Sequence, residues 1–289
     1  MPSFSFEAIG CPWQVDTGHE LSPGAKTSIL AKVRDFDQTW SRFRDDSVVA
    51  TIARDGGQVE FPKESAELSA LYRRVYELSG GSISPLVGGA LEHLGYDASY
   101  RLTPLPGAAV TPLWDEHVRW SGTTFASDVP VTLDIGAAGK GFLAGLVGEI
   151  VAADGQTVYT VDASGDLVNV GSTIRVGLEH PFQPGKAVGI AELADSSLCA
   201  SATNRRAWGQ GLHHLLDART GRPVEQIVAA WVICAQPGVA DLLATALFTT
   251  EPAVVAEAFE CEYVRMRSDG YIERSAGWPG EVFTRENVA

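Results

Sequence analysis

The spacing of apolar residues along the chain predicts a mixture of strands and helices. Residues 3–17 alternate apolar and polar positions on both sides of a central turn, which predicts a strand pair. Apolar residues three and four apart predict helices over residues 22–40 and 64–79. Residues 98–116 are rich in Pro and Gly, so we expect a surface loop there.

The second half of the chain repeats this mixture without a fixed alternation. Residues 134–153 predict a strand end, a glycine turn and an apolar helix. We expect short strands within 157–178 and near 187–193, 227–235 and 262–274, and helices over 239–248 and 252–259. Because strands and helices do not alternate strictly, the pattern favours the α+β class: a single domain over residues 1–289, with mixed, largely antiparallel sheets and flanking helices.

Composition and charge exclude several classes of function. Apolar residues make up 45 % of the 289 positions and charged residues 20 %, as in ordinary globular proteins. The net charge of −14 argues against a nucleic-acid-binding protein, which needs a basic surface, and against docking on an anionic membrane. An anionic ligand must therefore be bound by a local group of residues.

The N-terminus and the cysteines predict the compartment. No basic segment followed by an apolar one begins the chain, and no run of 18 apolar residues occurs, so neither a signal peptide nor membrane insertion is expected. The four cysteines are far apart and form no CxxC pair, which makes a zinc site or a disulfide framework unexpected and predicts free thiols. The expected location is the cytoplasm.

A glycine-rich turn is the first candidate for chemistry. It reads Leu133-Asp134-Ile135-Gly136-Ala137-Ala138-Gly139-Lys140-Gly141-Phe142 and stands at the entry to an apolar helix. Small residues allow a ligand to approach the backbone, and a helix N-terminus attracts anions, so Lys140 stands where a phosphate could bind. The spacing is not that of a nucleotide P-loop. A plain strand-to-helix turn with an exposed lysine is the alternative.

Two further segments carry candidate ligands and a candidate base. Asp241 and Thr245 are one helical turn apart, so both side chains lie on one face, and two hard oxygen donors plus a phosphate suit Mg²⁺. Alternatively, Asp241 caps its own helix and Thr245 bonds back within it. His213 and His214 follow each other in a short strand, so only one of them can face a given cleft, where it could accept a proton from a hydroxyl or be merely structural.

The segment Ser79-Gly80-Gly81-Ser82-Ile83-Ser84-Pro85 is typical of a helix end followed by a polar loop. The chain has no GxSxG nucleophile motif, which argues against a serine hydrolase.

The order of these motifs resembles that of the flavin transferase family, FAD:protein FMN transferase, also called ApbE. The resemblance extends from Ala8 to about Phe248, which is most of the chain. It is carried by Ser41-Arg42-Phe43 with Asp46-Ser47 ahead of a β-like run, Gly81-Ser82-Ile83-Ser84-Pro85, the glycine-rich turn, Asp162-Ala163-Ser164-Gly165-Asp166, Ser201 near Arg205, His213-His214-Leu215-Leu216-Asp217 with Thr220-Gly221 and Pro223, and Ala240-Asp241 with Ala244-Thr245-Ala246.

The resemblance implies an ApbE-like fold, related to the T-fold, and a Mg²⁺-dependent enzyme. Such an enzyme passes the FMN half of FAD to a threonine hydroxyl of an acceptor protein and releases AMP. Alternatives are hydrolysis of FAD to FMN and AMP, or FAD binding with little catalysis.

The resemblance also implies roles for individual residues. Mg²⁺ is expected at the backbone carbonyl of Ala137 and at Asp241 and Thr245, and His214 matches the base that acts on the acceptor hydroxyl. The expected flavin contacts are Ile9, Phe43, Ser82, Ile83, Ser84, Asp134, Lys140 and Leu215.

The sequence departs from the family's pattern beside the expected flavin. Where the family usually has Gly-Ala-Phe-Asp-Pro, this chain has Ile83 in place of the aromatic and Ser84 in place of the carboxylate. Ile9 stands where the family commonly has Met, and Asp162-Ala163-Ser164-Gly165 replaces a double-glycine turn. Most members carry a signal or lipoprotein peptide, and none is evident here.

Overall fold

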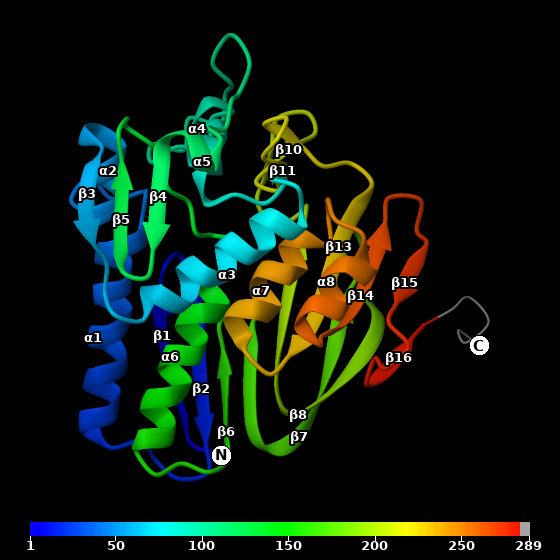
Figure 1. Cartoon of the computed structure of the whole chain (residues 1–289). Helices are drawn as coiled ribbons and strands as arrows, with labels where there is room; N and C mark the ends of the chain where they lie inside the picture. The colour runs from blue at the N-terminus through cyan, green and yellow to red at the C-terminus, as the bar shows by residue number, and fades with distance from the viewer. Residues whose placement is uncertain (284–289) are drawn as a thin grey trace.

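An antiparallel sheet of nine strands forms the centre of the computed structural model, which describes residues 1–283 (Figure 1). Each strand pair in it is antiparallel, as the sequence predicts. In spatial order the strands are β1 (Ser3–Ala8), β2 (Cys11–Thr17), β6 (Tyr159–Asp162), β7 (Leu167–Glu179), β8 (Ala187–Ala202), β13 (Ile227–Cys234), β14 (Glu262–Arg267) and β15 (Ile272–Arg274), with β16 (Gly280–Val282) paired to β8.

Helices cover one face of this sheet (Figure 1). The central ones are α6 (Gly139–Ala153) and α7 (Pro237–Ala246), and α1 (Pro23–Trp40) packs against α6. Two more, α3 (Ser65–Leu78) and α8 (Pro252–Phe259), pack against α7. No helix within residues 1–283 is both long enough and apolar enough to cross a bilayer.

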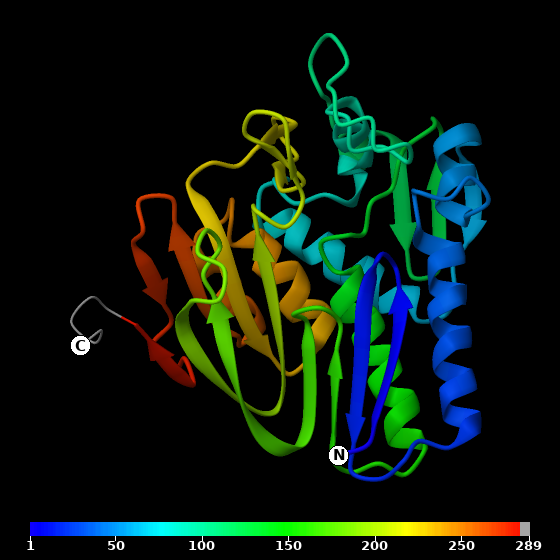
Figure 2. The same ribbon diagram turned by 180° about the vertical axis from the view of Figure 1, so that it is seen from behind.

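Smaller elements lie around the large sheet. A three-stranded sheet stands near α2 (Val48–Asp55) and consists of β3 (Gly57–Glu60), β5 (Thr124–Ser127) and β4 (Val118–Ser121). Its core is a cluster of packed aromatic rings. The remaining elements are η1 (Pro85–Val87), α4 (Gly88–His93), α5 (Trp114–His117), and the two-stranded ribbons β9 (Ala207–Trp208) with β10 (Leu212–His213) and β11 (Leu216–Asp217) with β12 (Arg222–Pro223). Figure 2 shows the large sheet from the side away from the helices, with the segments around β9–β12 beyond one end of it.

The predicted helices and the first strand pair are confirmed. In α1 the Ser22 side chain accepts a hydrogen bond from the Ala25 backbone, and Pro23 occupies the first turn, which is a standard helix start. The buried face of α1 includes Ile29, Val33 and Phe36, so the helical spacing in the sequence corresponds to real burial.

Two predictions of local structure are wrong. The run after Ser47 looked β-like, but Val48–Asp55 is a helix, because the Ser47 hydroxyl caps it and Val49 and Ile52 are buried three residues apart. Of the short strands expected within 157–178, the first is present as β6, but the others form one long strand, β7, which pairs with β8 in a long hairpin. Gly171, at φ +73°, marks an irregularity within β7 and not a chain reversal.

The cysteines are only partly as predicted. Cys11 and Cys199 are free, but Cys234 and Cys261 form a disulfide, which corrects the expectation of free thiols throughout. The two residues stand next to the facing pair Ile233 and Glu262 of β13 and β14, so the sheet brings them together across 26 intervening residues. Spacing in the sequence gave no signal of this contact.

Helices α6 and α7 approach each other closely at Gly141, and the site depends on this contact. A Cβ atom at Gly141, in the first turn of α6, would lie 2.4 Å from the Pro237 carbonyl oxygen and 2.7 Å from the Asp241 Cβ of α7. Only glycine fits there, and the two helices meet closely enough for the Gly141 N–H to donate a hydrogen bond of 2.8 Å to Asp241 Oδ2.

Gly141→Ala is expected to lower the free energy of unfolding by about 1–3 kcal/mol, because the added methyl group forces α6 and α7 apart. Urea denaturation measures this change. The control is Gly89→Ala in α4, where a Cβ meets no atom within 4 Å; it should raise stability by up to about 1 kcal/mol. Equal effects of the two substitutions would contradict the tight packing at Gly141.

Candidate active site

A cleft of about 870 Å³ opens beside the N-terminus of α6. It is lined by residues of the β1–β2 turn, the ends of α1 and α3, the glycine turn, α7 and the β9–β11 region. All twelve residues singled out from the sequence line this cleft: Ile9, Phe43, Ser82, Ile83, Ser84, Asp134, Ala137, Lys140, His214, Leu215, Asp241 and Thr245. The volume is within the usual range for small-molecule sites.

Oxygen donors gather where α7 meets the glycine turn. Asp241 lies in the second turn of α7 and binds the N–H of Gly141, so it caps α6 and not its own helix. Thr245, one turn further on, has its hydroxyl 3.2 Å from that of Ser201. The backbone carbonyl of Ala137 belongs to the turn that precedes α6. The alternative interpretation of Asp241 as a simple cap of its own helix is therefore wrong.

Lys140 is held at this end of the cleft by the β6–β7 turn. Its Nζ lies 2.6 Å from Asp166 Oδ2 and donates a 2.9 Å hydrogen bond to the carbonyl oxygen of Ala163. Burial alone would lower the pKa of Lys140, but the charges of Asp166 and Asp241 outweigh it and the pKa is raised. The ammonium is charged, and these two contacts leave one of its three N–H donors for a ligand.

The donor set fits a divalent cation bound together with a phosphate. Asp166 and Asp241 are both buried, and with Lys140 their formal charges leave a local excess of one negative charge. Burial, and then the charge of Asp166, raise the pKa of Asp241 well above its ordinary value, and a bound cation would lower it again. Within residues 1–283 no group of three His, Cys, Asp or Glu side chains could hold a metal, so carbonyl, hydroxyl and ligand oxygens must complete the shell.

The two histidines have different surroundings. His213 is buried and its Nε2 bonds the Val224 carbonyl, whereas His214 lines the cleft. The sequence prediction that only one of them faces the cleft is therefore confirmed. Within the described residues, Nδ1 of His214 is buried without a hydrogen-bond partner. Burial, followed by the charges of Arg206 and His213, lowers the pKa of His214 to about 3, so its imidazole is neutral near pH 7.

The β1–β2 turn presents a strained residue to the cleft. Ile9 has φ +43° and is followed by Gly10 at φ +78°, which together form the two-residue hairpin loop. A β-branched residue rarely adopts a positive φ, and such strain is concentrated at functional sites. This geometry supports a ligand contact at Ile9.

The hydroxyls of the Ser82-Ile83-Ser84 loop are used within the fold. Ser82 is buried and its Oγ lies 2.7 Å from the hydroxyl of Thr249, and Ser84 Oγ caps η1 through the Leu86 N–H. All three residues of the loop nevertheless line the cleft.

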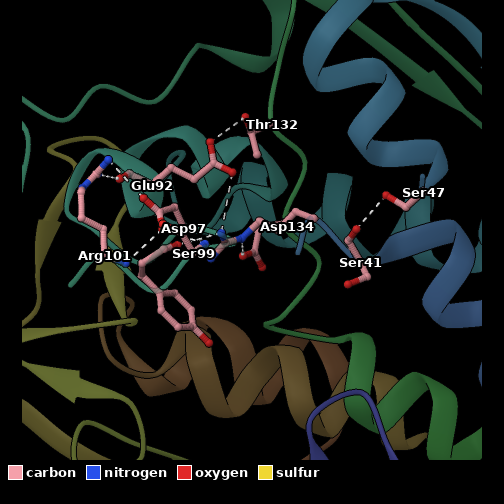
Figure 3. A network of polar contacts seen from close by, with 10 residues as sticks. Ser41, Ser47, Glu92, Asp97, Ser99, Arg101, Thr132 and Asp134 are labelled. Carbon is pink, nitrogen blue, oxygen red and sulfur yellow. Dashed lines mark hydrogen bonds and ion pairs between the residues drawn. The ribbon is translucent and has the colours of Figure 1, made fainter. Parts of the chain in front are cut away.

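Arg42 organises the other end of the cleft, and the sequence reasoning missed it as a site residue. Its guanidinium is buried, and its Nε donates to Asp134 Oδ2 at 2.6 Å and its Nη1 to the Tyr96 carbonyl at 2.8 Å. Glu92 lies 3.8 Å from Nη1, and Figure 3 shows Asp134 and Glu92 within this polar network. Burial would raise the pKa of Asp134, but the charge and hydrogen bond of Arg42 lower it overall.

Aromatic side chains extend this end of the cleft. Arg42 lies over the Phe43 ring at 4.2 Å, and Phe43 stacks with Tyr100 at 5.5 Å between ring centres. Tyr96 stacks in turn with Trp208. Phe43 was expected from the resemblance, but the others were not. The signal in the sequence was the Arg42-Phe43 pair of the Ser41-Arg42-Phe43 motif, because a guanidinium is attracted to the face of an aromatic ring.

Arg42→Gln is expected to destabilise the protein by about 3 kcal/mol near pH 7, because it leaves the Asp134 carboxylate in a buried position without its cation. Because the pKa of Asp134 is lower in the folded protein than in the unfolded chain, its pairing stabilises the fold at a pH above the unfolded-state pKa. This stabilisation is lost as the pH falls through the folded-state pKa. The penalty should therefore shrink below about pH 4. Urea denaturation at both pH values tests this, with the more exposed Arg44→Gln as control. A penalty that is independent of pH would contradict the pairing.

His214 should make the protein sensitive to mild acid. Its folded pKa of about 3 lies below the ordinary value of 6.5, so the unfolded chain binds a proton that the folded chain does not. Between pH 7 and pH 5 the wild type should therefore lose about 2 kcal/mol more stability than His214→Gln. The exposed His19→Gln should follow the wild type. Parallel pH curves for the wild type and His214→Gln would show that His214 is not buried in its neutral form.

Comparisons with known proteins identify the family of the chain. The ApbE family model matches residues 9–266. The chain is 26 % identical over 257 residues to the FAD:protein FMN transferase of Treponema pallidum, covering 78 % of this chain and 70 % of the relative. It is 27 % identical over 295 residues to the enzyme of that name from Rhodobacter capsulatus, covering 93 % of this chain. The chain spans only 56 % of the length of that second relative.

Solved structures show the same fold. The ApbE protein of Thermotoga maritima matches with a TM-score of 0.82 at 22 % identity, covering 95 % of this chain and 97 % of that one. The flavin transferase ApbE of Vibrio cholerae matches with a TM-score of 0.77 at 21 % identity and the same coverage. The α+β fold and the resemblance inferred from the motifs are both confirmed, and the chain belongs to the ApbE family.

Proposed function

We propose that this chain is a flavin transferase that passes the FMN half of FAD to a threonine hydroxyl of an acceptor protein and releases AMP. Relatives over most of the chain are named FAD:protein FMN transferases, which supports the activity. The observation that carries the proposal is that one cleft joins the oxygen donors around Asp241 to the neutral His214. These are the two ends that a diphosphate substrate and an acceptor hydroxyl require.

Different residues of the cleft have different roles in the proposed reaction. His214, unprotonated near neutral pH, takes the proton of the acceptor hydroxyl. The hydroxyl oxygen then bonds to the phosphorus of the FMN half, the bond between that phosphorus and the bridging oxygen breaks, and AMP leaves with the bridging oxygen. Lys140, held by Asp166, faces the negative charge of the diphosphate. Arg42 holds Asp134 in place beside the flavin end.

Asp241, Thr245 and the carbonyl of Ala137 would hold Mg²⁺. The ion supplies charge neutralisation of the diphosphate oxygens, which this acidic chain lacks. Ile9, Phe43, Ile83 and Leu215 would then contact the flavin, with the backbone of Ser82 and Ser84.

The cytoplasmic location stays a prediction. The Cys234–Cys261 disulfide argues against it, because the cytosol of most organisms keeps thiols reduced. The acceptor would be a flavoprotein whose threonine reaches His214 in the open cleft.

The test is incubation of the purified protein with FAD and Mg²⁺, with and without a threonine-bearing acceptor peptide, followed by chromatography. AMP should appear and FMN should be found on the peptide. Asp241→Asn should abolish AMP release. His214→Gln should slow transfer by about 100-fold to 10,000-fold while FAD still binds, as measured by fluorescence quenching.

Two outcomes would contradict the transferase proposal. AMP together with free FMN, in the presence of a competent acceptor, would identify a hydrolase. FAD that binds but stays intact under every condition would identify a flavin-binding protein without this chemistry. Exposed Asp128→Asn, far from the cleft lining, is the control for loss of one carboxylate and should behave as the wild type.

A further inference from the structure

Four cationic side chains line the cleft among the described residues, and three of them are already paired. Their partners are Asp134 for Arg42, Asp166 for Lys140 and Glu179 for Arg205. The fourth, Arg206, forms no ion pair and no side-chain hydrogen bond within residues 1–283. Within the described residues, its guanidinium is therefore available to an anionic ligand in the cleft.

The β9–β10 ribbon places Arg206 beside His214. Ala207 faces His213 in this antiparallel pair, and the next N–H, that of His214, donates to the carbonyl oxygen of Arg206 at 3.2 Å. Arg206 and His214 are therefore facing residues, and the side chains of facing residues lie on the same side of an antiparallel ribbon. Both residues line the cleft, so that side is the cleft side.

The positive charge of Arg206 acts on the pKa of other groups that line the cleft. After burial, it is the largest cause that lowers the pKa of His214. It also acts to lower the pKa of Asp134. Arg206 lines the same cleft as the oxygen donors of α7 and the expected flavin contacts, so a dinucleotide bound there would bring its diphosphate near this arginine.

We propose that Arg206 binds the diphosphate of FAD and contacts the phosphoryl group that is transferred beside His214. This inference rests on the proposed function and adds a residue to it. A guanidinium binds phosphate oxygens through two parallel hydrogen bonds, which fix the orientation of the phosphorus as well as neutralise it. The same positive charge helps to keep His214 unprotonated, so one side chain serves the phosphate and the base.

The binding test compares ligands with and without phosphate. Arg206→Gln should weaken the binding of FAD and FMN by about 10-fold to 100-fold and leave riboflavin binding unchanged, as measured by fluorescence quenching. Arg206→Lys, which keeps the charge but loses the paired donors, should fall between Arg206→Gln and the wild type. The matched control is Arg222→Gln, which removes an exposed arginine of the same segment outside the cleft lining and should bind as the wild type.

A kinetic readout separates binding from transfer. Arg206→Gln should lower kcat for AMP release as well as raise KM for FAD, because the guanidinium is needed while charge shifts onto the leaving phosphate. Unchanged FAD binding and turnover would overturn the inference. So would an equal loss of riboflavin affinity, which would show that Arg206 only shapes the flavin pocket.

Failure of the proposed function is distinguishable from failure of this inference. If the wild type releases no AMP, the transferase proposal fails, and calorimetry with inorganic diphosphate then decides the role of Arg206 by itself. Binding of diphosphate that is lost in Arg206→Gln supports the inference. Binding that is equal in both proteins overturns it.

Discussion

The site depends on the close approach of α6 and α7 at Gly141. Because no side chain separates the helices there, the buried carboxylate of Asp241 reaches the first turn of α6 and satisfies one of its free N–H groups. That contact fixes Asp241 and Thr245 beside the glycine turn that carries Ala137. A carboxylate so placed, next to Asp166 whose partner is Lys140, adds a negative charge that a metal ion would balance.

The two ends of the cleft have different chemical environments and are formed by different elements of the fold. The α6–α7 end is rich in oxygen donors and charge, whereas the Arg42 end combines a buried ion pair with stacked rings. A ligand that is aromatic at one end and anionic in the middle matches this division. The β9–β10 ribbon supplies His214 and Arg206 between the two ends, and it does so from an otherwise irregular part of the chain.

Periodicity in the sequence predicted most of the helices, because their buried faces recur at three and four residues. It failed where caps and long-range pairing decide the outcome. The Ser47 cap turns a β-branched run into α2, and Gly171 is an irregularity inside β7 that looked like a turn. The Cys234–Cys261 contact follows from strand pairing, which spacing alone does not reveal.

The site was predictable mainly through the order of motifs. All twelve expected residues line one cleft, although their individual roles stay predictions. Arg206 could not be found in this way, because its importance depends on the register that sets it opposite His214. Likewise, the serines at 82 and 84 looked like ligand contacts, but their hydroxyls bond within the fold.

Because residues 1–283 alone offer too few ligands for Mg²⁺, we expect the metal and the diphosphate to bind together. The most direct test is calorimetric titration of Mg²⁺ into the protein with and without saturating FAD. The account predicts that FAD strengthens Mg²⁺ binding by about 5-fold to 150-fold, with Mg²⁺ strengthening FAD binding by the same factor. Equal Mg²⁺ affinity with and without FAD would contradict it.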